Sequence, residues 1–498
     1  MLKKVRVALA WVFWIGITLL LLDVSGVLHT YLGWMAKLQF LPAVLAVNVA
    51  VIVALVLLTL LFGRVYCSVI CPLGVFQDGI SWLGTRGSKR PYQYRKELKW
   101  LRYGVLALFV IALIVGIQAF VAFLAPYSAY GRMVQNLLQP VYIWGNNLFA
   151  AWAEKAGSYA FYSREVWLRS VPTLVVAVVT LVAIVALAFK GGRTYCNSIC
   201  PVGTVLSFFS RFAMFRPVID RSKCVHCKAC EHHCKAHCIA IGKDTEKIDY
   251  SRCVDCFNCI GHCKSGALKY RFAWGREMAG QAGNGGNQAS RRAFMTGTAV
   301  ALGAAAFKGI EARAQEGAKK LDGGLADLLP KQAPQRETPL TPPGSKSVKD
   351  FYRRCTGCQL CVAQCPNNVL RPSSDLEHLM QPQMSFERGW CRPECVRCAE
   401  LCPAGAIGKI TREEKTQYRV GVSQVNLAMC VSACGKASCG KCAQACPSGA
   451  IQMVENKENG QLMPVVAEEL CTGCGACEYL CPVRPVSAIT VNGRTQHI

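Results

Sequence analysis

Thirty cysteines stand out in this chain of 498 residues, and most of them follow one spacing. In the pattern C-x2-C-x2-C-x3-C, three closely spaced thiolates hold one [4Fe–4S] cluster and the fourth reaches a neighbouring cluster. Four copies are complete, beginning at Cys224, Cys253, Cys355 and Cys471. Two further runs, at Cys391 and around Cys439, are variants with a longer first gap or a displaced first cysteine. The spacing therefore predicts electron-carrying iron–sulfur chemistry.

Crossed ligation pairs the six runs into three two-cluster modules. The six predicted sets account for 24 cysteines and predict six [4Fe–4S] clusters. Zinc sites pair two ligands per knuckle, and disulfides at this spacing would close strained loops, so we favour clusters over both. The absence of C-x-x-C-H excludes c-type haem. The sets are: first, Cys224, Cys227, Cys230, Cys263; second, Cys253, Cys256, Cys259, Cys234; third, Cys355, Cys358, Cys361, Cys402; fourth, Cys391, Cys395, Cys398, Cys365; fifth, Cys439, Cys442, Cys481 with Cys430 or Cys434; sixth, Cys471, Cys474, Cys477, Cys446.

Four more cysteines lie in an internal repeat. Residues 63–74 (GRVYCSVICPLG) match residues 192–203 (GRTYCNSICPVG) at an offset of 129. Cys67 with Cys71, and Cys196 with Cys200, have the i, i+4 spacing that places both thiols on one helix face. Three interpretations stay open for the two pairs: a further Fe–S cluster, a redox-active dithiol, or packing cysteines.

Four apolar runs, at about 7–22, 43–62, 103–124 and 171–189, are each near the roughly 20 residues needed to cross a bilayer. Most of the net charge of +26 lies before residue 315, mainly beside these runs. This distribution indicates positive-inside topology rather than nucleic-acid binding. No A-x-A site follows the first run, so we expect it to be retained. We expect a bacterial inner-membrane protein with four helices and both ends of this region in the cytoplasm.

The composition divides the chain into five predicted regions. They are a membrane domain (1–215), a cytoplasmic two-cluster module (216–275), a linker with an internal signal (276–314), a Pro-rich linker (315–349) and a periplasmic four-cluster domain (350–498). The signal has a twin-arginine motif at Arg291 and Arg292, a short apolar stretch, and a small-x-small site ending at Ala314. A chance Arg-Arg before a fifth anchor helix is the alternative. The predicted fold class is a membrane α-helical bundle, four helices plus a fifth signal or anchor helix, with α+β ferredoxin-like two-cluster modules.

Few ionisable residues lie near the predicted membrane helices, and such residues are functional candidates. Asp23 ends the first run, His29 lies beyond it, and Asp78 follows the first repeat. Because a quinol releases protons as it gives up electrons, these three are candidate proton acceptors. They are equally interpreted as polar residues at helix ends.

The motifs resemble a known pair of proteins. Residues 1–275 resemble NapH, through the four apolar runs, the two C-x3-C-P repeats and the module ending at Cys263. Residues 288–498 resemble NapG and the MauM proteins, which are Tat-exported and carry four clusters. The chain is thus similar to a fusion of the two. The resemblance implies a quinol dehydrogenase that draws on the membrane quinone pool and supplies a periplasmic redox protein, such as a cytochrome or a molybdoenzyme system for nitrate.

Two other functions remain open on the sequence. One is an electron conduit from a cytoplasmic ferredoxin or flavoprotein that docks at residues 224–263. The other is a maturation or reactivation factor for a periplasmic metalloenzyme. With any of the three functions, about 30 Å of hydrocarbon would separate the two groups of clusters, which is too wide for one efficient electron step. Either a bound quinone or a membrane-embedded site bridges this distance, or the two groups of clusters do not share electrons.

Overall fold

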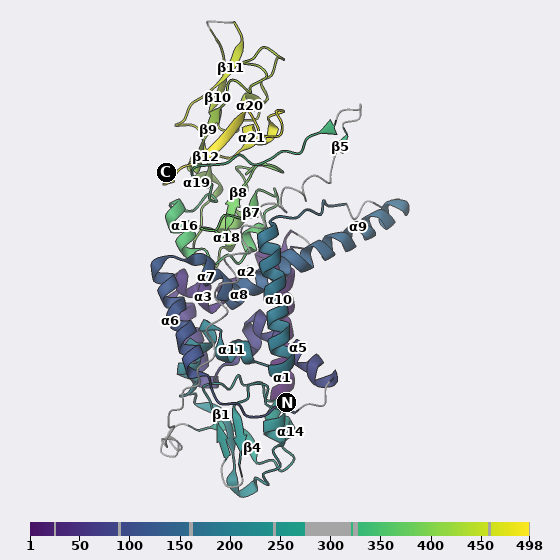
Figure 1. Cartoon of the computed structure of the whole chain (residues 1–498), viewed down its shortest axis with the longest axis vertical. Helices are drawn as coiled ribbons and strands as arrows, with labels where there is room; N and C mark the ends of the chain where they lie inside the picture. The colour runs from purple at the N-terminus through teal and green to yellow at the C-terminus, as the bar shows by residue number, and fades with distance from the viewer. Residues whose placement is uncertain are drawn as a thin grey trace. The chain divides into compact units, whose positions relative to one another are not determined.

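The computed structural model describes residues 1–23, 26–87, 91–158, 163–242, 246–273, 320–321, 327–456 and 460–497. It divides into two compact units, Met1–Tyr142 with Val175–Gly297, and Ile143–Leu174 with Thr298–Ile498. Figure 1 shows the elements of both. The predicted export signal, with Arg291, Arg292 and Ala314, lies outside the described residues.

The first unit combines a helical bundle with a small α+β module. Around the repeats, the π-helix η1 (Tyr66–Ile70) contacts α1 and α5, and α12 packs on α4 and α6. The bundle therefore surrounds the two C-x3-C-P segments. The helices from the N-terminus to the second repeat are α1 (Leu2–Leu22), α2 (Leu28–Lys37), α3 (Phe40–Leu45), α4 (Val49–Phe62), α5 (Pro72–Gly87), α6 (Lys99–Val115), α7 (Gln118–Leu124), α8 (Pro126–Met133), η2 (Val134–Leu138), α9 (Gln139–Lys155), α10 (Val171–Gly191), α11 (Thr194–Ser198) and α12 (Pro201–Ser210). Of these, most of α9 and the first residues of α10 belong to the second unit.

Two described helices, α1 and α10, are long and apolar enough to cross a membrane by length and composition. The other two predicted spans are interrupted. The run at 43–62 is shared between α3 and α4, because Asn48 caps the start of α4 by accepting a hydrogen bond from the Val51 N–H. The run at 103–124 breaks at Gly116, whose left-handed conformation (φ 94°) ends α6 before α7 begins.

The outward faces of these helices are apolar. Trp11 of α1, Val53 of α4, Ile114 of α6 and Val182 of α10 are each about half exposed or more, and Ile114 reaches 72%. Contiguous exposed apolar surface on a folded protein marks contact with a partner or a lipid phase. The polar side chains of the bundle are instead turned inward, around the repeats.

Two modules have the same doubly repeated strand–cysteine loop–helix–strand order. In the first unit, β1 (Phe215–Ile219) pairs with β4 (Leu268–Phe272) and β2 (Ile239–Ile241) pairs with β3 (Glu246–Ile248), all antiparallel. Their helices are α13 (Ala229–His232) and α14 (Asn258–His262). In the second unit, β9 (Gly421–Val425) pairs with β12 (Ile489–Gly493) and β10 (Ile451–Glu455) with β11 (Leu462–Val466). Their helices are α20 (Lys441–Gln444) and α21 (Ala476–Leu480).

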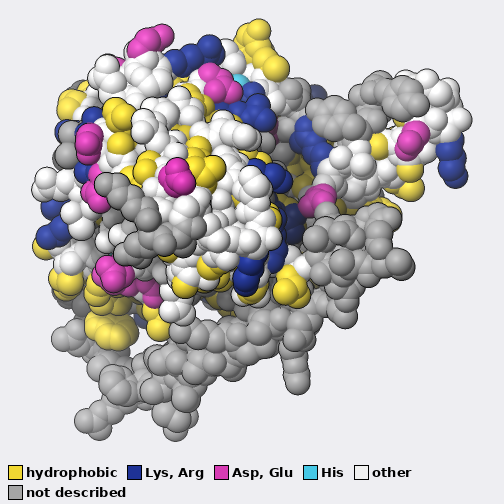
Figure 2. All heavy atoms as spheres, turned by 90° about the horizontal axis from the view of Figure 1, so that it is seen from above, with side chains coloured by type: hydrophobic (Ala, Val, Ile, Leu, Met, Phe, Trp, Pro, Cys, Tyr) yellow, Lys and Arg dark blue, Asp and Glu magenta, His cyan; other side chains and the backbone are white. Residues whose placement is uncertain are grey.

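A third module precedes this one in the second unit. It contains α16 (Val348–Arg354), α17 (Leu360–Ala363), α18 (Arg397–Leu401), α19 (Arg412–Gln417) and the antiparallel strands β7 (Leu370–Pro372) and β8 (Pro382–Met384). A short strand pair, β5 (Lys320–Leu321) with β6 (Asp327–Leu328), comes before it. Leu340, Phe386 and Val491 belong to one buried core that joins the two modules. Basic and acidic side chains are interspersed on the face in Figure 2.

Candidate metal centres

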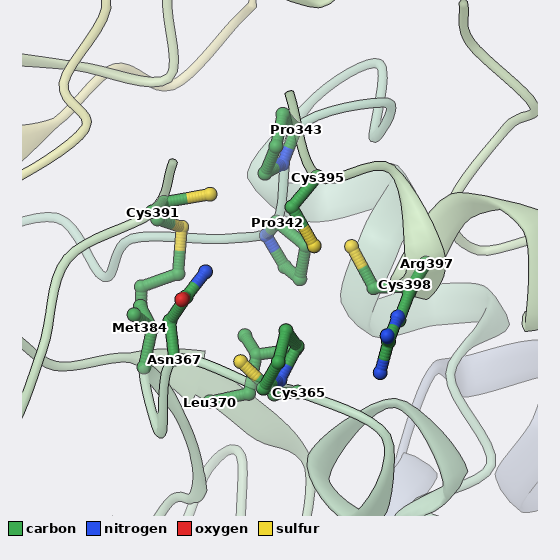
Figure 3. Close-up of a pocket in the computed structure, with 12 residues that line it drawn as sticks. Pro342, Pro343, Cys365, Asn367, Leu370, Met384, Cys391, Cys395, Arg397 and Cys398 are labelled. Atoms are coloured by element: carbon green, nitrogen blue, oxygen red, sulfur yellow. The ribbon is translucent and has the colours of Figure 1, made fainter. Parts of the chain in front are cut away.

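The cysteines of the two-cluster modules gather as crossed sets. Cys365, Cys391, Cys395 and Cys398, the fourth set, line one pocket, and Figure 3 shows their sulfur atoms directed into it. Elsewhere, each short run lies within electrostatic range of the distant cysteine of its set: Cys230 of Cys263, Cys259 of Cys234, Cys361 of Cys402, and Cys474 of Cys446. Cys259 and Cys361 are also within range of Cys230 and Cys398 of the neighbouring sets, so this observation is compatible with crossed sets and does not prove them.

The structure favours Cys430 over Cys434 as the fourth cysteine of the fifth set. A pocket is lined by Cys430, Cys439, Cys442 and Cys481, and Cys442 is coupled to Cys430. Cys434 is exposed, and its thiol donates to the carbonyl oxygens of Leu427 and Ala428 at 3.4 and 3.2 Å. Cys434 therefore serves the turn rather than the pocket.

The cysteine loops have a shared conformation that fits a cluster. In each of the four complete runs, the residue before the second cysteine and the residue after it are both left-handed. They are Gly473 and Gly475 around Cys474, and non-glycine residues such as Asp255 and Phe257 around Cys256. Left-handed residues turn successive N–H groups toward one concave side, an arrangement found at anion and Fe–S sites. Non-glycine residues adopt it at a cost, which indicates a functional constraint.

The spacing of the sulfur atoms does not fit a single metal ion. Sulfur ligands of tetrahedral zinc lie about 3.8 Å apart, from Zn–S bonds of about 2.3 Å. Within the described part of the chain, the only three candidate ligand atoms within 4.8 Å of one another belong to Cys224, His226 and Glu246. Burial raises the pKa of Cys391 and of Cys442 to about 11, so ligand binding there must displace protons. The sets fit a larger, anionic cofactor.

Cys67, Cys71, Cys196 and Cys200 form a second kind of centre, here called the cysteine tetrad. Each is 5% exposed or less. Cys67 lies in η1 and Cys196 in α11, while Cys71 and Cys200 directly precede the prolines that begin α5 and α12. Proline favours the first helical position, since it lacks the N–H that would be unpaired there. The C-x3-C-P motif thus places one cysteine in each short helix and one at the start of the next helix.

Two arginines join the repeats. Arg64 Nη2 donates to the Cys196 carbonyl oxygen (3.2 Å), and Arg193 Nη1 donates to the Cys67 carbonyl oxygen (2.8 Å). Each guanidinium also approaches the sulfur of its own repeat, at 3.9 Å for Cys67 and 3.7 Å for Cys196. Both arginines are fully buried. The repeats therefore form one structure rather than two independent sites.

The last glycine of each repeat makes room for this exchange. A Cβ at Gly74 would lie 2.1 Å from the Cys67 carbonyl oxygen and 2.7 Å from Arg193 Nη1. A Cβ at Gly203 would lie 2.3 Å from the Cys196 carbonyl oxygen and 2.9 Å from Arg64 Nη2. Neither position has space for a side chain.

Asp78 lies at the centre of a buried charge cluster. Its oxygens are 2.8 Å from Arg193, 3.0 Å from Lys235 and 2.7 Å from Arg6. Burial alone would raise the pKa of Asp78, but the three cations hold it well below its usual range. A carboxylate held in this way stays ionised at physiological pH. The geometry favours a structural role for Asp78 over proton acceptance.

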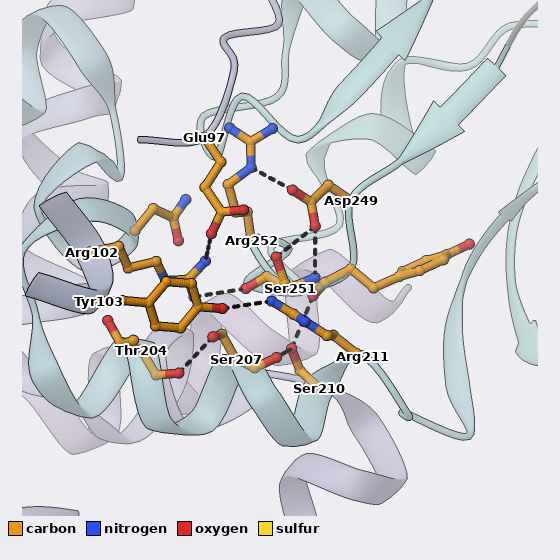
Figure 4. A network of polar contacts seen from close by, with 12 residues as sticks. Glu97, Arg102, Tyr103, Thr204, Ser207, Ser210, Arg211, Asp249, Ser251 and Arg252 are labelled. Atoms are coloured by element: carbon orange, nitrogen blue, oxygen red, sulfur yellow. Dashed lines mark hydrogen bonds and ion pairs between the residues drawn. The ribbon is translucent and has the colours of Figure 1, made fainter. Parts of the chain in front are cut away.

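The two-cluster module of the first unit docks directly on the tetrad. The Lys235 carbonyl, next to Cys234, accepts from the Arg193 N–H at 2.9 Å. The Ser251 carbonyl, two residues before Cys253, accepts from Arg64 (3.1 Å) and Arg102 (3.3 Å). Figure 4 shows the polar network that anchors this loop on α6 and α12. Since Cys234 and Cys253 belong to the second set, that set lies beside the tetrad and the first set lies farther out.

Asp23 and His29 are not part of this centre. Asp23 ends α1 with a left-handed conformation, and His29 lies in α2. Arg6, near the start of the same helix, contacts Asp78. The 17 residues between Arg6 and Asp23 span about 26 Å of helix. The three proton-acceptor candidates therefore occupy opposite ends of the bundle.

In the second unit the two modules meet at the fourth and sixth sets. The Cys391 N–H donates to the Cys474 carbonyl oxygen at 2.9 Å. The buried ammonium of Lys415 donates to the carbonyl oxygens of Arg392 and Cys395, both at 2.5 Å. The segment before α10 packs near the third set, where Arg169 donates to the Val362 carbonyl oxygen (3.3 Å). The spatial order is therefore third, fourth, sixth, fifth.

Comparison with known protein families agrees with this arrangement. A 4Fe-4S binding domain family matches residues 44–91 and 173–219, the segments that carry the two repeats. A 4Fe-4S dicluster domain matches residues 433–484, and a second 4Fe-4S binding domain matches residues 348–371. Fold and site thus define an iron–sulfur electron-transfer protein of the ferredoxin type.

Relatives specify the family. The chain is 30% identical to the methylamine utilization ferredoxin-type protein MauM of Paracoccus denitrificans, over 40% of this chain and 85% of MauM. It is 28% identical to the ferredoxin-type protein NapF of Escherichia coli, over 34% of this chain and 96% of NapF. A putative electron transport protein, YccM of Escherichia coli, is 25% identical over 39% of this chain and 47% of YccM. This chain belongs to the family of Nap/Mau-like ferredoxin-type proteins. No solved structure matches it.

Proposed function

We propose that this protein is a membrane-bound quinol dehydrogenase, a natural fusion of a NapH-like part with a Tat-exported NapG/MauM-like part. It takes electrons from the quinone pool and passes them through six [4Fe–4S] clusters to a periplasmic cytochrome or molybdoenzyme system. Residues 216–275 face the cytoplasm and residues 315–498 the periplasm. The supporting observation is the docking of the second cysteine set's loops on Arg193 and Arg64, the arginines of the two repeats inside the apolar bundle.

The chain's own residues supply the surroundings for this electron transfer. The cysteine sets hold clusters that accept and give up one electron at a time. The docking of Lys235 and Ser251 on Arg193 and Arg64 keeps the second set fixed beside the bundle. The apolar outer faces of α1, α4, α6 and α10 suit a lipid surround, although two of the four predicted passes are built from broken helices.

Asp23 and His29 are the candidates for proton release from quinol. They lie at the end of the bundle away from Asp78, which is committed to its three cations. A quinol oxidised near Asp23 would release its protons on the side opposite the two-cluster module. This places proton release and the cytoplasmic clusters on different faces of the membrane.

A second candidate function rests on the exposure of the first set. Cys227 is exposed, and its neighbour Val225 is 70% exposed. Basic residues surround them, including the exposed Arg221, Lys223 and Lys228. An apolar spot with a basic rim beside a cluster suits a soluble, acidic electron donor. The chain would then carry electrons from the cytoplasm without oxidising quinol.

One anaerobic experiment separates the two functions. A reduced menaquinol analogue is added to the oxidised, detergent-purified full chain, and cluster absorbance and EPR are followed. Prompt bleaching that slows at least tenfold in D23N or H29Q, but not in the control D350N on α16, supports quinol oxidation. Absence of bleaching by quinol, with rapid bleaching by a reduced acidic ferredoxin, overturns it in favour of the soluble donor.

A further inference from the structure

We propose that the two C-x3-C-P repeats hold one iron–sulfur cluster between them, with Cys67, Cys71, Cys196 and Cys200 as its four ligands. Each repeat contributes two thiolates, so neither forms a site alone. The proposal adds a seventh cluster to the six predicted sets and locates it inside the apolar bundle. Only its direction of electron flow rests on the proposed function; the site itself does not.

The first support is proximity. Arg64 Nη2 lies 3.9 Å from the Cys67 sulfur and 3.2 Å from the Cys196 carbonyl oxygen, and Arg193 Nη1 lies 3.7 Å from the Cys196 sulfur and 2.8 Å from the Cys67 carbonyl oxygen. All four are buried and free of disulfides. Yet no three of these sulfur atoms lie within 4.8 Å of one another, the spacing expected for one ion. In this respect the tetrad resembles the six cysteine sets: its sulfur atoms are grouped, but they are too far apart to bind a single metal ion.

The second support is the hydrogen bonding of the sulfur atoms. Gln77 Nε2 donates to Cys196 at 3.4 Å, and the Gly203 N–H donates to Cys200 at 3.4 Å. The Gly74 N–H serves Cys71 in the same way. With the two arginines near Cys67 and Cys196, every sulfur of the tetrad has an N–H group directed at it. N–H donors of this kind surround cluster thiolates and tune their potential.

The third support is charge. Arg6, Arg64, Arg193 and Lys235 are four buried cations, 8% exposed or less, around the tetrad. Two carboxylates face them: Asp78, and Asp255, which accepts from the Arg64 backbone N–H. About two positive charges are left without a protein carboxylate, and Lys235 among these cations also faces the second cysteine set.

The basic surroundings favour an anionic occupant of the tetrad over neutral thiols or a disulfide, because buried cations without a counter-charge are costly in a low dielectric. An oxidised [2Fe–2S] or [4Fe–4S] core carries a charge of +2, and four thiolates add −4, so the bound cluster carries about −2. A cluster thus adds the negative charge that these surroundings favour, whereas packing cysteines and a disulfide add none.

Arg64 and Arg193 explain why the site is shared. Each binds the first cysteine of the opposite repeat through its carbonyl group, so the two pairs of thiols are held at a set separation. Lys235 forms an ion pair with Asp78 and directly follows Cys234, a cysteine of the second set. The tetrad and the second set therefore share one buried charge network.

The test is a count of bound iron and sulfide on the full chain, purified anaerobically in detergent. Six [4Fe–4S] clusters contain about 24 iron atoms, and we expect the wild-type chain to contain more than that number. The double variant C67A/C196A, which removes one ligand from each repeat, should lose two irons for a [2Fe–2S] or four for a [4Fe–4S] cluster and retain the rest. The control C434A, at an exposed cysteine outside the pockets, should match wild type.

Equal iron in wild type and C67A/C196A, with identical Mössbauer spectra, overturns the proposal. If the double variant fails to fold, native mass spectrometry of the wild-type chain decides: seven bound clusters support the proposal and six overturn it. Neither readout needs an electron donor. A failure of quinol to bleach the clusters is therefore a separate result, which bears on the proposed function alone.

Discussion

Arg64 and Arg193 occupy the same position in the two repeats, and each guanidinium crosses to the other repeat to bind a cysteine carbonyl oxygen, at 3.2 and 2.8 Å. Since both side chains are fully buried, the exchange holds the two halves of the bundle together where their cysteines meet. We expect substitutions around this exchange to destabilise the first unit, and two of the following predictions test that expectation.

Replacing Asp78 with Asn should destabilise the first unit by roughly 3–5 kcal/mol, because it leaves three buried cations without their shared carboxylate. The folded pKa of Asp78 is depressed, so its contribution is present above the unfolded pKa of about 3.9 and is lost as pH falls through the folded value. The gap between wild type and D78N should stay constant from about pH 5 to 8.

Thermal unfolding in detergent measures this difference. The control D350N removes a partly exposed ion pair with Arg354 on α16 and should cost no more than about 1 kcal/mol. A gap that grows or closes between pH 5 and 8 would show that Asp78 titrates there, contrary to the ion-pair geometry.

Gly74→Ala should disrupt the tetrad, because the added methyl group meets the Cys67 carbonyl oxygen and Arg193. Gly79, on the same helix α5, has no atom within 4 Å of its Cβ position. G79A should be neutral or stabilise by up to about 1 kcal/mol, as alanine is the better helix former. Iron content and unfolding temperature distinguish the two variants. Equal iron content and equal unfolding temperature in G74A and G79A would contradict the close approach of Gly74 to the Cys67 carbonyl oxygen.

Cys430→Ser should impair the fifth cluster, whereas Cys434→Ser should leave it intact. Cys430 lines the pocket with Cys439, Cys442 and Cys481, and the thiol of Cys434 is bound to backbone carbonyl groups. The loss expected in C430S is up to four irons per chain, visible in iron content and in the EPR spectrum of the reduced protein. The opposite pattern would assign the ligand to Cys434.

Lys415→Met should lower the reduction potential of the fourth cluster by about 100 mV. The reason is that the substitution removes a buried cation from the loop that carries Cys395. An EPR-monitored redox titration of the full chain gives the shift. Lys409, exposed a few residues earlier, provides the matched control K409M. An unchanged reduction potential in K415M, with full iron content, would mean that the Lys415 ammonium stabilises the loop conformation without affecting the potential of the cluster.

The cysteine spacing alone predicted much of the site. Crossed sets follow from the x2, x2, x3 gaps, since three ligands of one loop leave the fourth cysteine facing the other cluster. The repeat also contained a signal that cysteine spacing ignores: Arg64 and Gly74 recur as Arg193 and Gly203. Their pairing across the repeats could not be predicted, because it depends on how two distant segments fold together.

Other features left no usable trace in the sequence. The apolar runs at 43–62 and 103–124 are long enough for one helix each, yet Asn48 and Gly116 interrupt the helical structure. Hydropathy averages over such single residues and does not detect them. Lys415 stands among ordinary surface charges in the sequence, and only tertiary structure places its ammonium on the Cys395 carbonyl oxygen.

The hydrogen bond from the Cys391 N–H to the Cys474 carbonyl oxygen fixes the fourth set beside the sixth. In the sequence the sets come in the order third, fourth, fifth, sixth, but along the proposed electron path the fifth set comes last, after the sixth. Loss of the sixth cluster would cut off an intact fifth cluster from the other clusters, whereas loss of the fifth cluster would remove only the last carrier. We therefore expect loss of Cys446, a cysteine of the sixth set, to impair electron transfer through the second unit more than loss of Cys430, a cysteine of the fifth set.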